Sequence, residues 1–360
     1  MNNPNIDSLF DFKPYSLEKS KKELYLNELF FQLTKYHYAN CYEYKCLIDS
    51  MNFNVDFKSA YVDIPFIPVR LFKMYDLLSV PKKLIFKTMM SSGTSGQAVS
   101  KVFLDKKTSL NQSKALTKII STFLGSKRSP MLIIDSEEVL KNRNMFSARG
   151  AGILGFSIFG KKRIYALDKN MKLKVNEVTE FLNQNQNQKI FLFGFTFMIY
   201  KYFIQEIMKN KLNFNLTNAV LIHGGGWKKL ENNQISSKDF RKILKDLSGL
   251  NLIHDYYGMV EQTGSIYMEC ENGYLHAPVF SDVIIRRSHD FSEASFEEPG
   301  IIQTLSTLPK SYPGHSLLTE DEGVLLGEDD CKCGRNGKYF TILGRIKNAE
   351  IRGCSDTYGG

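Results

Sequence analysis

Between residues 131 and 256, short apolar segments alternate with longer segments of helical periodicity. The apolar segments are rich in Ile, Leu, Val and Phe and lie at residues 131–135, 190–194, 219–223 and 252–256. The helical segments precede or separate them, at residues 107–123, 175–183, 196–209 and 238–247. Strands buried on both faces form continuous apolar runs, and strands that alternate with helices form parallel sheets. The sequence therefore predicts an α/β fold whose mostly parallel sheet is covered by helices on both faces.

The regions on either side of this alternation differ from it. Residues 1–60 are predicted to be mostly helical, and from residue 274 onward the predicted elements become short and β-rich, as at residues 283–286 and 300–304. No clean linker separates these regions, so we expect one compact body with subdomains. Its expected parts are a helical N-terminal segment (1–80), a main body (81–343) and a short C-terminal tail (344–360).

Composition and charge narrow the class of protein. The 360 residues are 43% hydrophobic and 24% charged, which is typical of a globular protein. The net charge of +9 favours anionic ligands, but its lysines are scattered and form no basic run interleaved with aromatics, so we expect no nucleic-acid partner. The first residues lack the basic start and apolar core of a signal peptide. The most hydrophobic run, residues 190–200, is shorter than the roughly 20 apolar residues that span a bilayer. We therefore expect a cytoplasmic protein without a membrane span, whose six cysteines stay reduced.

The segment MSSGTSGQAVSK, residues 90–101, is predicted to bind phosphate. Its small and hydroxyl-bearing residues are Ser92, Gly93, Thr94, Ser95 and Gly96, and Lys101 follows them. Glycines let backbone amides turn toward an anion, hydroxyls donate hydrogen bonds, and the lysine adds charge. Residues 83–89 before it are predicted to form a strand, which is the setting of phosphate loops. The Gly-to-Lys spacing is not that of a Walker loop, and a flexible Ser/Gly surface loop is the alternative interpretation.

Two further glycine-containing segments follow predicted strands. His223-Gly224-Gly225-Gly226-Trp227 comes after one strand, and Tyr257-Gly258-Met259-Val260-Glu261 comes after the next. Ligands of open α/β sheets bind at the carboxyl ends of strands, and glycines there let a flat ring lie against bare backbone. Both segments are therefore candidate ligand contacts, with ordinary turns as the alternative.

Three cysteines and a histidine form a candidate metal site. Cys270, His276, Cys331 and Cys333 follow the pattern C-x5-H … C-x-C. Four ligands of this kind suit the closed tetrahedral site of a structural zinc ion. Reduced cysteines without a metal, beside an unrelated histidine, are the alternative.

In their order along the chain, these motifs resemble those of adenylate-forming enzymes. Within that group the chain is most similar to the acyl-protein synthetase family of bacterial luminescence systems (the LuxE type). The matching strings lie between roughly residues 65 and 358 and are PFIPVRLFK, SSGTSGQ, HGGGW, DYYGMVEQTG and EIRGCSDTY. The cysteine set also resembles that of some phenylacetate-CoA-ligase-like adenylate formers. The resemblance implies the large domain of this superfamily, with a very short tail in place of the usual lid, since sixteen residues follow Gly344.

The resemblance also implies which residues contact Mg-ATP. They are expected to be Ser92, Gly93, Thr94, Ser95, Gly96 and Lys101 at the phosphates, Gly224, Gly225, Gly226, Tyr257 and Gly258 around the adenine and acyl pocket, Glu261 at Mg²⁺, Asp321 at the ribose, and Arg345 at the ribose or α-phosphate. Glu320 and Glu322 flank Asp321, so the choice within this acidic run stays open.

A cysteine near the end of the chain carries the second part of the implied chemistry. By resemblance, Cys354 accepts the acyl group as a thioester after ATP has activated a carboxylic acid, most naturally a fatty acid, and a partner such as an acyl reductase then takes it. The alternatives are delivery to CoA, to a carrier protein or to a sugar amine in surface-polysaccharide assembly, or a nucleotide-binding or interaction protein that has lost catalysis. The lid lysine of most adenylate formers is absent, which argues against an ordinary CoA ligase.

Overall fold

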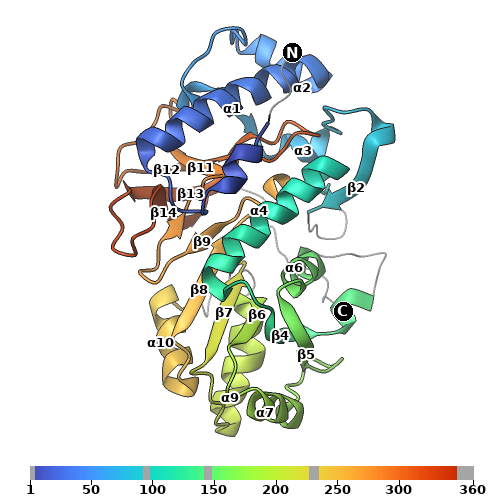
Figure 1. Ribbon diagram of the computed structural model, residues 1–360, viewed down its shortest axis with the longest axis vertical. Helices are drawn as coiled ribbons and strands as arrows, with labels where there is room; N and C mark the ends of the chain where they lie inside the picture. The colour runs from blue at the N-terminus through green and yellow to red at the C-terminus, as the bar shows by residue number, and fades with distance from the viewer. Residues whose placement is uncertain (1–4, 92–97, 142–147, 227–234, 347–360) are drawn as a thin grey trace. The chain divides into compact units, whose positions relative to one another are not determined.

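The computed structural model describes residues 5–91, 98–141, 148–226 and 235–346 (Figure 1). The described residues form two compact units. Unit 1 contains most of Met1–Ser91, Gln97–Ile120 and Gly258–Glu350, and unit 2 is built from Ser121–Tyr257.

Unit 2 contains a parallel sheet of five strands in the order β8-β7-β6-β4-β5. The strands are β4 (Ser129–Ser136), β5 (Gly160–Leu167), β6 (Ile190–Phe195), β7 (Ala219–Gly224) and β8 (Leu252–Tyr257). Every residue of β4, β6 and β7 is buried, because these strands lie inside the sheet and their side chains are apolar on both faces. The predicted α/β fold with a mostly parallel sheet is thereby confirmed.

Helices connect these strands and lie beside the sheet (Figure 1). They are α5 (Glu138–Lys141), α6 (Ala148–Ser157), α7 (Val175–Gln184), α8 (Thr196–Met198), a π-helical segment (Ile199–Ile204), α9 (Gln205–Asn210) and α10 (Ser237–Ser248). The bounds of α10 follow from its caps: the Ser236 side chain accepts a hydrogen bond from Asp239 N at 3.0 Å, and Gly249 adopts φ 72° at the other end. The helix predicted over residues 196–209 is present, with the π-helical segment in its middle.

Unit 1 contains mostly antiparallel strands, as the short β-rich elements after residue 274 indicate. Its main strands pair in the order β11-β12-β13-β14-β10-β9, β1 pairs in parallel with β13, and β2 pairs with β3 in a separate ribbon. The strands are β1 (Ile67–Pro68), β2 (Ile85–Met90), β3 (Lys101–Asp105), β9 (Tyr267–Glu269), β10 (Leu275–His276), β11 (Ser281–Arg286), β12 (Pro299–Ser306), β13 (Ser316–Glu328) and β14 (Lys338–Arg345).

The helices of the N-terminal region pack against this antiparallel sheet. They are α1 (Lys19–Asn40), α2 (Tyr42–Ser50) and α3 (Leu71–Met74), and 3-10 helices lie in the same region at Asp7–Asp11, Tyr61–Asp63 and Lys82–Leu84. Later in the chain, α4 (Lys106–Leu124) follows β3, and a further 3-10 turn lies at Val260–Gln262. Leu26, Phe30 and Leu33 of α1 lie on one face at helical spacing and are buried against Ile284 and Leu305 of the sheet. In the part of the chain that the structure describes, none of the helices has both the length and the apolar character needed to cross a membrane.

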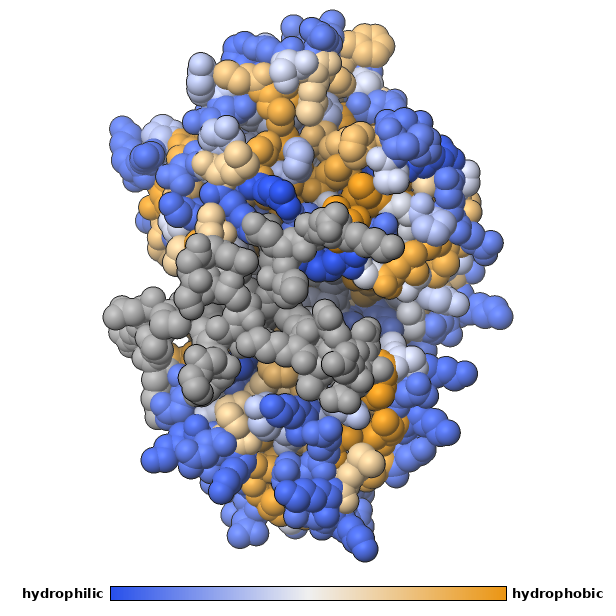
Figure 2. All heavy atoms as spheres, turned by 180° about the vertical axis from the view of Figure 1, so that it is seen from behind, coloured by the Kyte–Doolittle hydropathy of each residue, from blue (hydrophilic) through white to orange (hydrophobic). Residues whose placement is uncertain are grey.

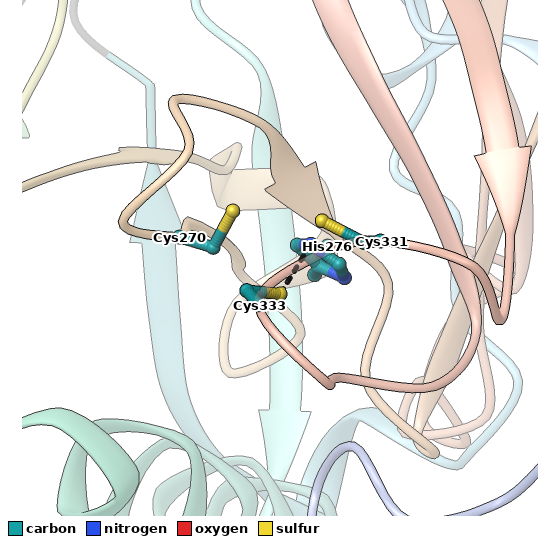
Figure 3. Close-up of side chains that lie close together, drawn as sticks. All are labelled: Cys270, His276, Cys331 and Cys333. Atoms are coloured by element: carbon teal, nitrogen blue, oxygen red, sulfur yellow. Dashed lines mark hydrogen bonds between the residues drawn. The ribbon is translucent and has the colours of Figure 1, made fainter.

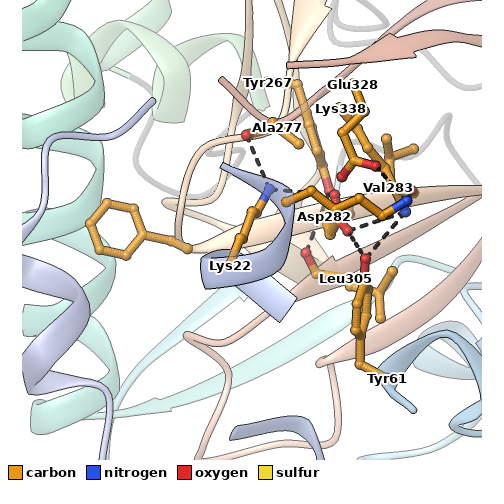
Figure 4. A network of polar contacts seen from close by, with 12 residues as sticks. Lys22, Tyr61, Tyr267, Ala277, Asp282, Val283, Leu305, Glu328 and Lys338 are labelled. Carbon is orange, nitrogen blue, oxygen red and sulfur yellow. Dashed lines mark hydrogen bonds and ion pairs between the residues drawn. The ribbon is translucent and has the colours of Figure 1, made fainter. Parts of the chain in front are cut away.

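Charged residues are buried beneath α1 in unit 1 (Figure 4). Asp282 of β11 is fully buried and lies between Lys22 of α1 and Lys338 of β14, with N–O distances of 3.4 and 3.3 Å. The Tyr61 hydroxyl donates a hydrogen bond to the same carboxylate at 2.5 Å. Burial opposes ionisation of Asp282, but the two ammonium groups outweigh it and hold the pKa of the carboxyl below its usual range. This network ties the N-terminal helix to two strands that are distant in sequence.

Replacement of Asp282 is therefore expected to destabilise unit 1 strongly. Asp282→Asn keeps the shape of the side chain but leaves two buried lysines without their counter-charge, and we expect the free energy of unfolding to fall by about 3–5 kcal/mol. Urea titration followed by circular dichroism measures this difference. Asp49→Asn, at an exposed ion pair with Lys45, is the matched control and should change little. A loss below about 1 kcal/mol for Asp282→Asn, as for exposed pairs, would contradict a stabilising role for the network.

Candidate functional site

The four predicted metal ligands lie together in unit 1 (Figure 3). The ligand atoms of Cys270, His276, Cys331 and Cys333 all lie within 4.8 Å of one another. His276 and Cys270 are fully buried, and Cys333 is partly exposed. A tetrahedral zinc site with Zn–S bonds of 2.3 Å places its sulfurs about 3.8 Å apart, so the four side chains are close to the arrangement that a zinc ion requires.

Two hairpin turns position these ligands. Cys270 and His276 lie on either side of the turn between β9 and β10, which closes through a hydrogen bond from Cys270 N to Tyr274 O at 2.8 Å. Cys331 and Cys333 lie in the turn between β13 and β14, where Gly334 N donates to Cys331 O at 2.9 Å. Gly334 has φ 75°, a conformation that a residue with a side chain rarely adopts.

The two turns are also joined by a bidentate ion pair. Both terminal nitrogens of Arg335 donate to the Glu271 carboxylate, at 2.5 and 3.0 Å. Because each turn contributes two of the four ligands, this pair holds the two halves of the cluster in register. This ion pair was not predicted from sequence, since Glu271 and Arg335 are distant in sequence and both residue types are common on protein surfaces.

The electrostatics of the cluster suit a metal ligand set. Burial, and a smaller effect of the Arg335 cation, lower the pKa of His276 to about 4, so the imidazole is neutral at pH 7, as a metal ligand must be. Burial raises the pKa of the Cys270 thiol to about 12, and the other two cysteines add to this effect, since closely spaced thiolates repel one another. At Cys333, burial is outweighed by hydrogen bonds and charge from Arg335, which lower the pKa of the thiol. Among the described residues, the buried Nδ1 atom of His276 has no hydrogen-bond partner. These residues fit a divalent zinc ion, which would supply the missing positive charge.

A second group of polar side chains lies at the carboxyl end of the parallel sheet in unit 2. His223, near the end of β7, is buried, and its Nδ1 lies 2.9 Å from the Thr196 hydroxyl and 3.6 Å from Asp255 of β8. Burial lowers the pKa of His223 to about 3, with smaller contributions from Arg241 and His254. At the end of β4, buried Asp135 pairs with buried Arg149 of α6 at 3.0 Å. Ligands of open α/β sheets bind at this edge.

The glycines after β7 are packed against aromatic rings of the chain itself. A Cβ atom on Gly224 would lie 2.5 Å from the Tyr256 ring, and one on Gly225, at φ 76°, would lie 3.1 Å from the Phe195 ring. Gly226 is exposed and would meet nothing within 4 Å. Tyr256 and Phe195 therefore leave no room for a side chain at Gly224 and Gly225. Neither aromatic residue was predicted from sequence to contact these glycines.

The predicted ribose contact lies in a group of acidic and arginine side chains in unit 1. Asp321 of β13 and Arg345 of β14 are register partners, and their side chains approach to 3.5 Å. Arg345 also pairs with Glu320 at 2.8 Å, and Glu320 pairs in turn with Arg70 at 3.1 Å. Glu320 is buried between two arginines while Asp321 is partly exposed. Asp321 is therefore more accessible than Glu320, while Glu322, the other acid of this run, is exposed. Arg70 belongs to the PFIPVRLFK string but was not predicted as a site residue.

Glu261, the predicted magnesium ligand, is buried in the 3-10 turn Val260–Gln262 of unit 1. Tyr312 donates to its backbone carbonyl at 2.9 Å, and Gln112 of α4 donates to the Tyr312 hydroxyl at 3.2 Å. The neighbouring Gln262 donates to the carbonyls of Thr304 and Gly314 at 3.1 and 2.9 Å. These bonds fix the turn. Tyr257 ends β8 and Gly258 is exposed directly after it.

Lys101 is the first residue of β3, and its Nζ lies 3.6 Å from Asp76. The predicted phosphate loop follows β2 and precedes β3, so it joins the strands of an antiparallel ribbon instead of leading from a strand into a helix. Hydrogen bonds between Ser91 and Ser100, at 2.9 and 3.0 Å, close the base of this connection. Ser92, Gly93, Thr94, Ser95, Gly96 and Cys354 lie outside the described residues.

A family model described as acyl-protein synthetase, LuxE, matches residues 2–359. The chain belongs to this family. A long-chain-fatty-acid–luciferin-component ligase of Aliivibrio fischeri is 25% identical over 181 residues, which are 49% of this chain and 46% of that protein. The match thus spans less than half the length of that relative.

Solved structures confirm the fold of the family member described here. The open conformation of a 2-hydroxyisobutyryl-CoA ligase, in complex with 2-HIB-AMP and CoA, has a TM-score of 0.73 and 15% identity, and covers 96% of this chain and 80% of that chain. The same ligase in its thioesterification state has a TM-score of 0.72 and 14% identity, with 96% and 73% covered. At these identities the comparison shows the adenylate-forming fold alone.

Proposed function

We propose that this protein is an ATP-dependent acyl-protein synthetase that activates a carboxylic acid as its acyl-adenylate. The observation that carries the proposal is the family match over residues 2–359, together with the ordered motifs that lie within it. In the first step a carboxylate oxygen attacks the α-phosphorus of ATP. A new P–O bond forms, the bond between the α-phosphorus and the oxygen that bridges it to the β-phosphate breaks, and pyrophosphate leaves.

The residues proposed for this step are those that would bind the phosphates, the ribose and the magnesium ion of Mg-ATP. The loop of residues 92–96 and Lys101 would bind the phosphates through amides, hydroxyls and an ammonium group, which stabilise negative charge as pyrophosphate departs. Asp321, held beside Arg345 at 3.5 Å, would accept hydrogen bonds from the ribose hydroxyls. Glu261 would hold Mg²⁺, which supplies Lewis-acid stabilisation of the phosphates when bound. The hydrogen bonds that hold the backbone of this turn support the role, because they fix the position from which the Glu261 side chain extends.

In the second step the thiolate of Cys354 is proposed to attack the carbonyl carbon of the acyl-adenylate. A C–S bond forms, the C–O bond to the phosphate breaks, and AMP leaves. The protein then carries an acyl-thioester, which a partner such as an acyl reductase removes. The name of the Aliivibrio fischeri relative supports a long-chain fatty acid as the substrate. A free thiol requires a reducing compartment, so the cytoplasm is the proposed location.

Pyrophosphate exchange tests the first step. Thr94→Ala combined with Lys101→Ala removes a hydroxyl and a charge proposed to act on phosphate, so fatty-acid-dependent exchange between labelled pyrophosphate and ATP should fall by about 10² or more, as for loss of one preorganised donor. Thr179→Ala combined with Lys172→Ala removes the same groups from exposed positions in unit 2 and should leave the exchange unchanged. Unaltered exchange in the first variant would reject the phosphate-loop assignment, and no exchange with any carboxylic acid in the parent would reject adenylation.

We also propose that Cys270, His276, Cys331 and Cys333 bind one structural zinc ion. The closed ligand set, its burial and its two supporting hairpins favour a structural role over a catalytic one, because a catalytic zinc keeps a coordination position open for substrate or water. The ion would fasten the β9–β10 turn to the β13–β14 turn, which is the same connection that the Arg335–Glu271 pair makes.

A further inference from the structure

Five connecting segments form the amino-terminal edge of the parallel sheet in unit 2, and together they contain cations but no acid. Each segment leads into one of the five strands, and two of them include the first residues of their strand; they are residues 125–129, 158–162, 183–189, 209–218 and 248–251. Their seven basic residues are Lys127, Arg128, Lys161, Lys162, Lys189, Lys209 and Lys211, and none of the segments contains Asp or Glu. The nearest acids in the sequence are Glu180, Glu206 and Asp246 of the adjoining helices. We call these five segments the basic edge.

Hydrogen bonds show that the segments of the basic edge lie side by side. Ser129 N donates to Phe159 O at 3.2 Å, and Lys189 Nζ donates to Leu124 O at 3.4 Å. Along the other half of the edge, the bonds run from Asn218 Nδ2 to Gln186 O at 2.9 Å and from Leu216 N to Ser248 O at 2.8 Å. These seven basic residues therefore lie along one edge of unit 2, whereas other basic residues of the unit, among them Lys172, Lys201 and Lys242, lie outside these segments.

Apolar side chains are exposed within the segments of the basic edge or directly next to them in sequence. All seven basic residues are exposed, and Ile158, Met208 and Leu252 are 43%, 55% and 42% exposed. Apolar side chains are exposed in other parts of the molecule too, and Figure 2 shows patches of them among hydrophilic side chains on one face. The two aromatic residues of the basic edge, Phe159 and Phe214, are instead buried. The edge thus offers positive charge and aliphatic groups to a partner, without exposed rings.

We propose that the basic edge binds the surface of an anionic lipid bilayer as a peripheral contact. Lys and Arg near a bilayer are attracted to anionic headgroups, and exposed aliphatic side chains enter the headgroup and acyl boundary. A single-stranded nucleic acid would be bound through phosphate contacts and through bases stacked on aromatic rings, and the rings of this edge are not available. The absence of acids within these segments favours any polyanion, and of a nucleic acid and a lipid surface only the lipid surface also uses Ile158, Met208 and Leu252.

The position of the basic edge is compatible with catalysis on a bound membrane. Ligands of parallel sheets bind at the carboxyl ends of the strands, and the basic edge lies at their amino ends. Contact with lipid would therefore leave the ligand-binding end of this sheet open to solvent. The contact would also hold the enzyme where fatty acids partition. This advantage rests on the substrate proposed above, whereas lipid binding itself does not.

Vesicle co-sedimentation of the full chain tests the proposal. The parent should pellet with vesicles of equal parts phosphatidylglycerol and phosphatidylcholine, should not pellet with phosphatidylcholine alone, and should be released as salt rises. The edge variant Lys127→Gln, Arg128→Gln, Lys161→Gln, Lys209→Gln should lose at least about tenfold in vesicle partitioning. The control Lys21→Gln, Lys82→Gln, Lys106→Gln, Lys238→Gln removes equal charge at exposed positions elsewhere and should bind as the parent does.

A second variant tests the aliphatic part of the contact. Met208→Ser combined with Leu252→Ser should weaken binding to anionic vesicles without altering its salt dependence.

Equal binding of the parent to both vesicle types, or no binding to either, would overturn the proposal. Loss of binding in the control variant to the same extent as in the edge variant would also overturn it, by showing that net charge suffices. Tighter binding to duplex DNA than to anionic vesicles at the same salt would identify a nucleic-acid surface instead. Pyrophosphate exchange, measured on every variant, should stay at the parental rate, so failure here is distinguishable from failure of the proposed enzymatic activity.

Discussion

The Cys354→Ser variant is expected to retain pyrophosphate exchange while losing its acyl label completely. Exchange depends on the nucleotide site, from which no group is removed. Thioester formation needs a thiolate, and a serine hydroxyl is a far weaker nucleophile at neutral pH. With radioactive fatty acid and ATP, the parent should therefore carry label that hydroxylamine releases, and the variant should carry none.

Cys46→Ser provides the matched control, because Cys46 is an exposed cysteine in unit 1 that has no proposed role. It should acquire hydroxylamine-labile label as the parent does. Label that persists on Cys354→Ser would show that another residue carries the acyl group. If exchange and label disappear together, Cys354 acts before thioester formation, and the proposed order of the two steps is wrong.

The parallel sheet of unit 2 could be predicted from sequence because its inner strands have no polar face. Predicted and observed ends differ by at most two residues for β4, β6, β7 and β8. Strand β5 was missed because Lys161, Lys162 and Arg163 follow its first residue, and charged side chains are tolerated there because β5 is the edge strand of the sheet. Helix α6 was missed because three of its ten residues are glycines, which have low helix propensity. Gly152 is needed there, since a Cβ atom would lie 3.0 Å from the Phe195 ring.

The cluster of candidate metal ligands could be predicted from residue type and spacing, because Cys and His close together in sequence have few structural uses. Other parts of the candidate site depend on contacts between distant segments. Arg70 and Glu320 are 250 residues apart, and His223 meets Thr196 only because β6 and β7 end side by side. No local pattern marks such pairs, since Arg, Glu and Thr are common surface residues. The fold places them together.

Zinc is expected at about one ion per chain in the purified protein, and Cys331→Ser should lose it. Replacing one thiolate by a hydroxyl removes a quarter of the ligand set, and serine binds zinc poorly. A ligand that binds only the folded state, present at about 1,000 times its Kd, stabilises that state by about 4 kcal/mol, so loss of zinc should lower stability by a similar amount. Elemental analysis measures the metal, and urea titration measures the stability.

Cys41→Ser separates loss of the metal from the general cost of a polar atom in the interior. Cys41 is also buried, at 2% exposure, but lies in the core formed with Tyr44 and Phe72, away from the four ligands. Its variant should keep zinc and lose less stability than Cys331→Ser. A chelator should lower the stability of the parent and of Cys41→Ser, but not that of Cys331→Ser, because only that variant has already lost the ion. Protein that contains no zinc when purified and is indifferent to added zinc and to chelators would show that Cys270, His276, Cys331 and Cys333 are ordinary buried side chains, with Arg335 and Glu271 alone joining the two hairpin turns.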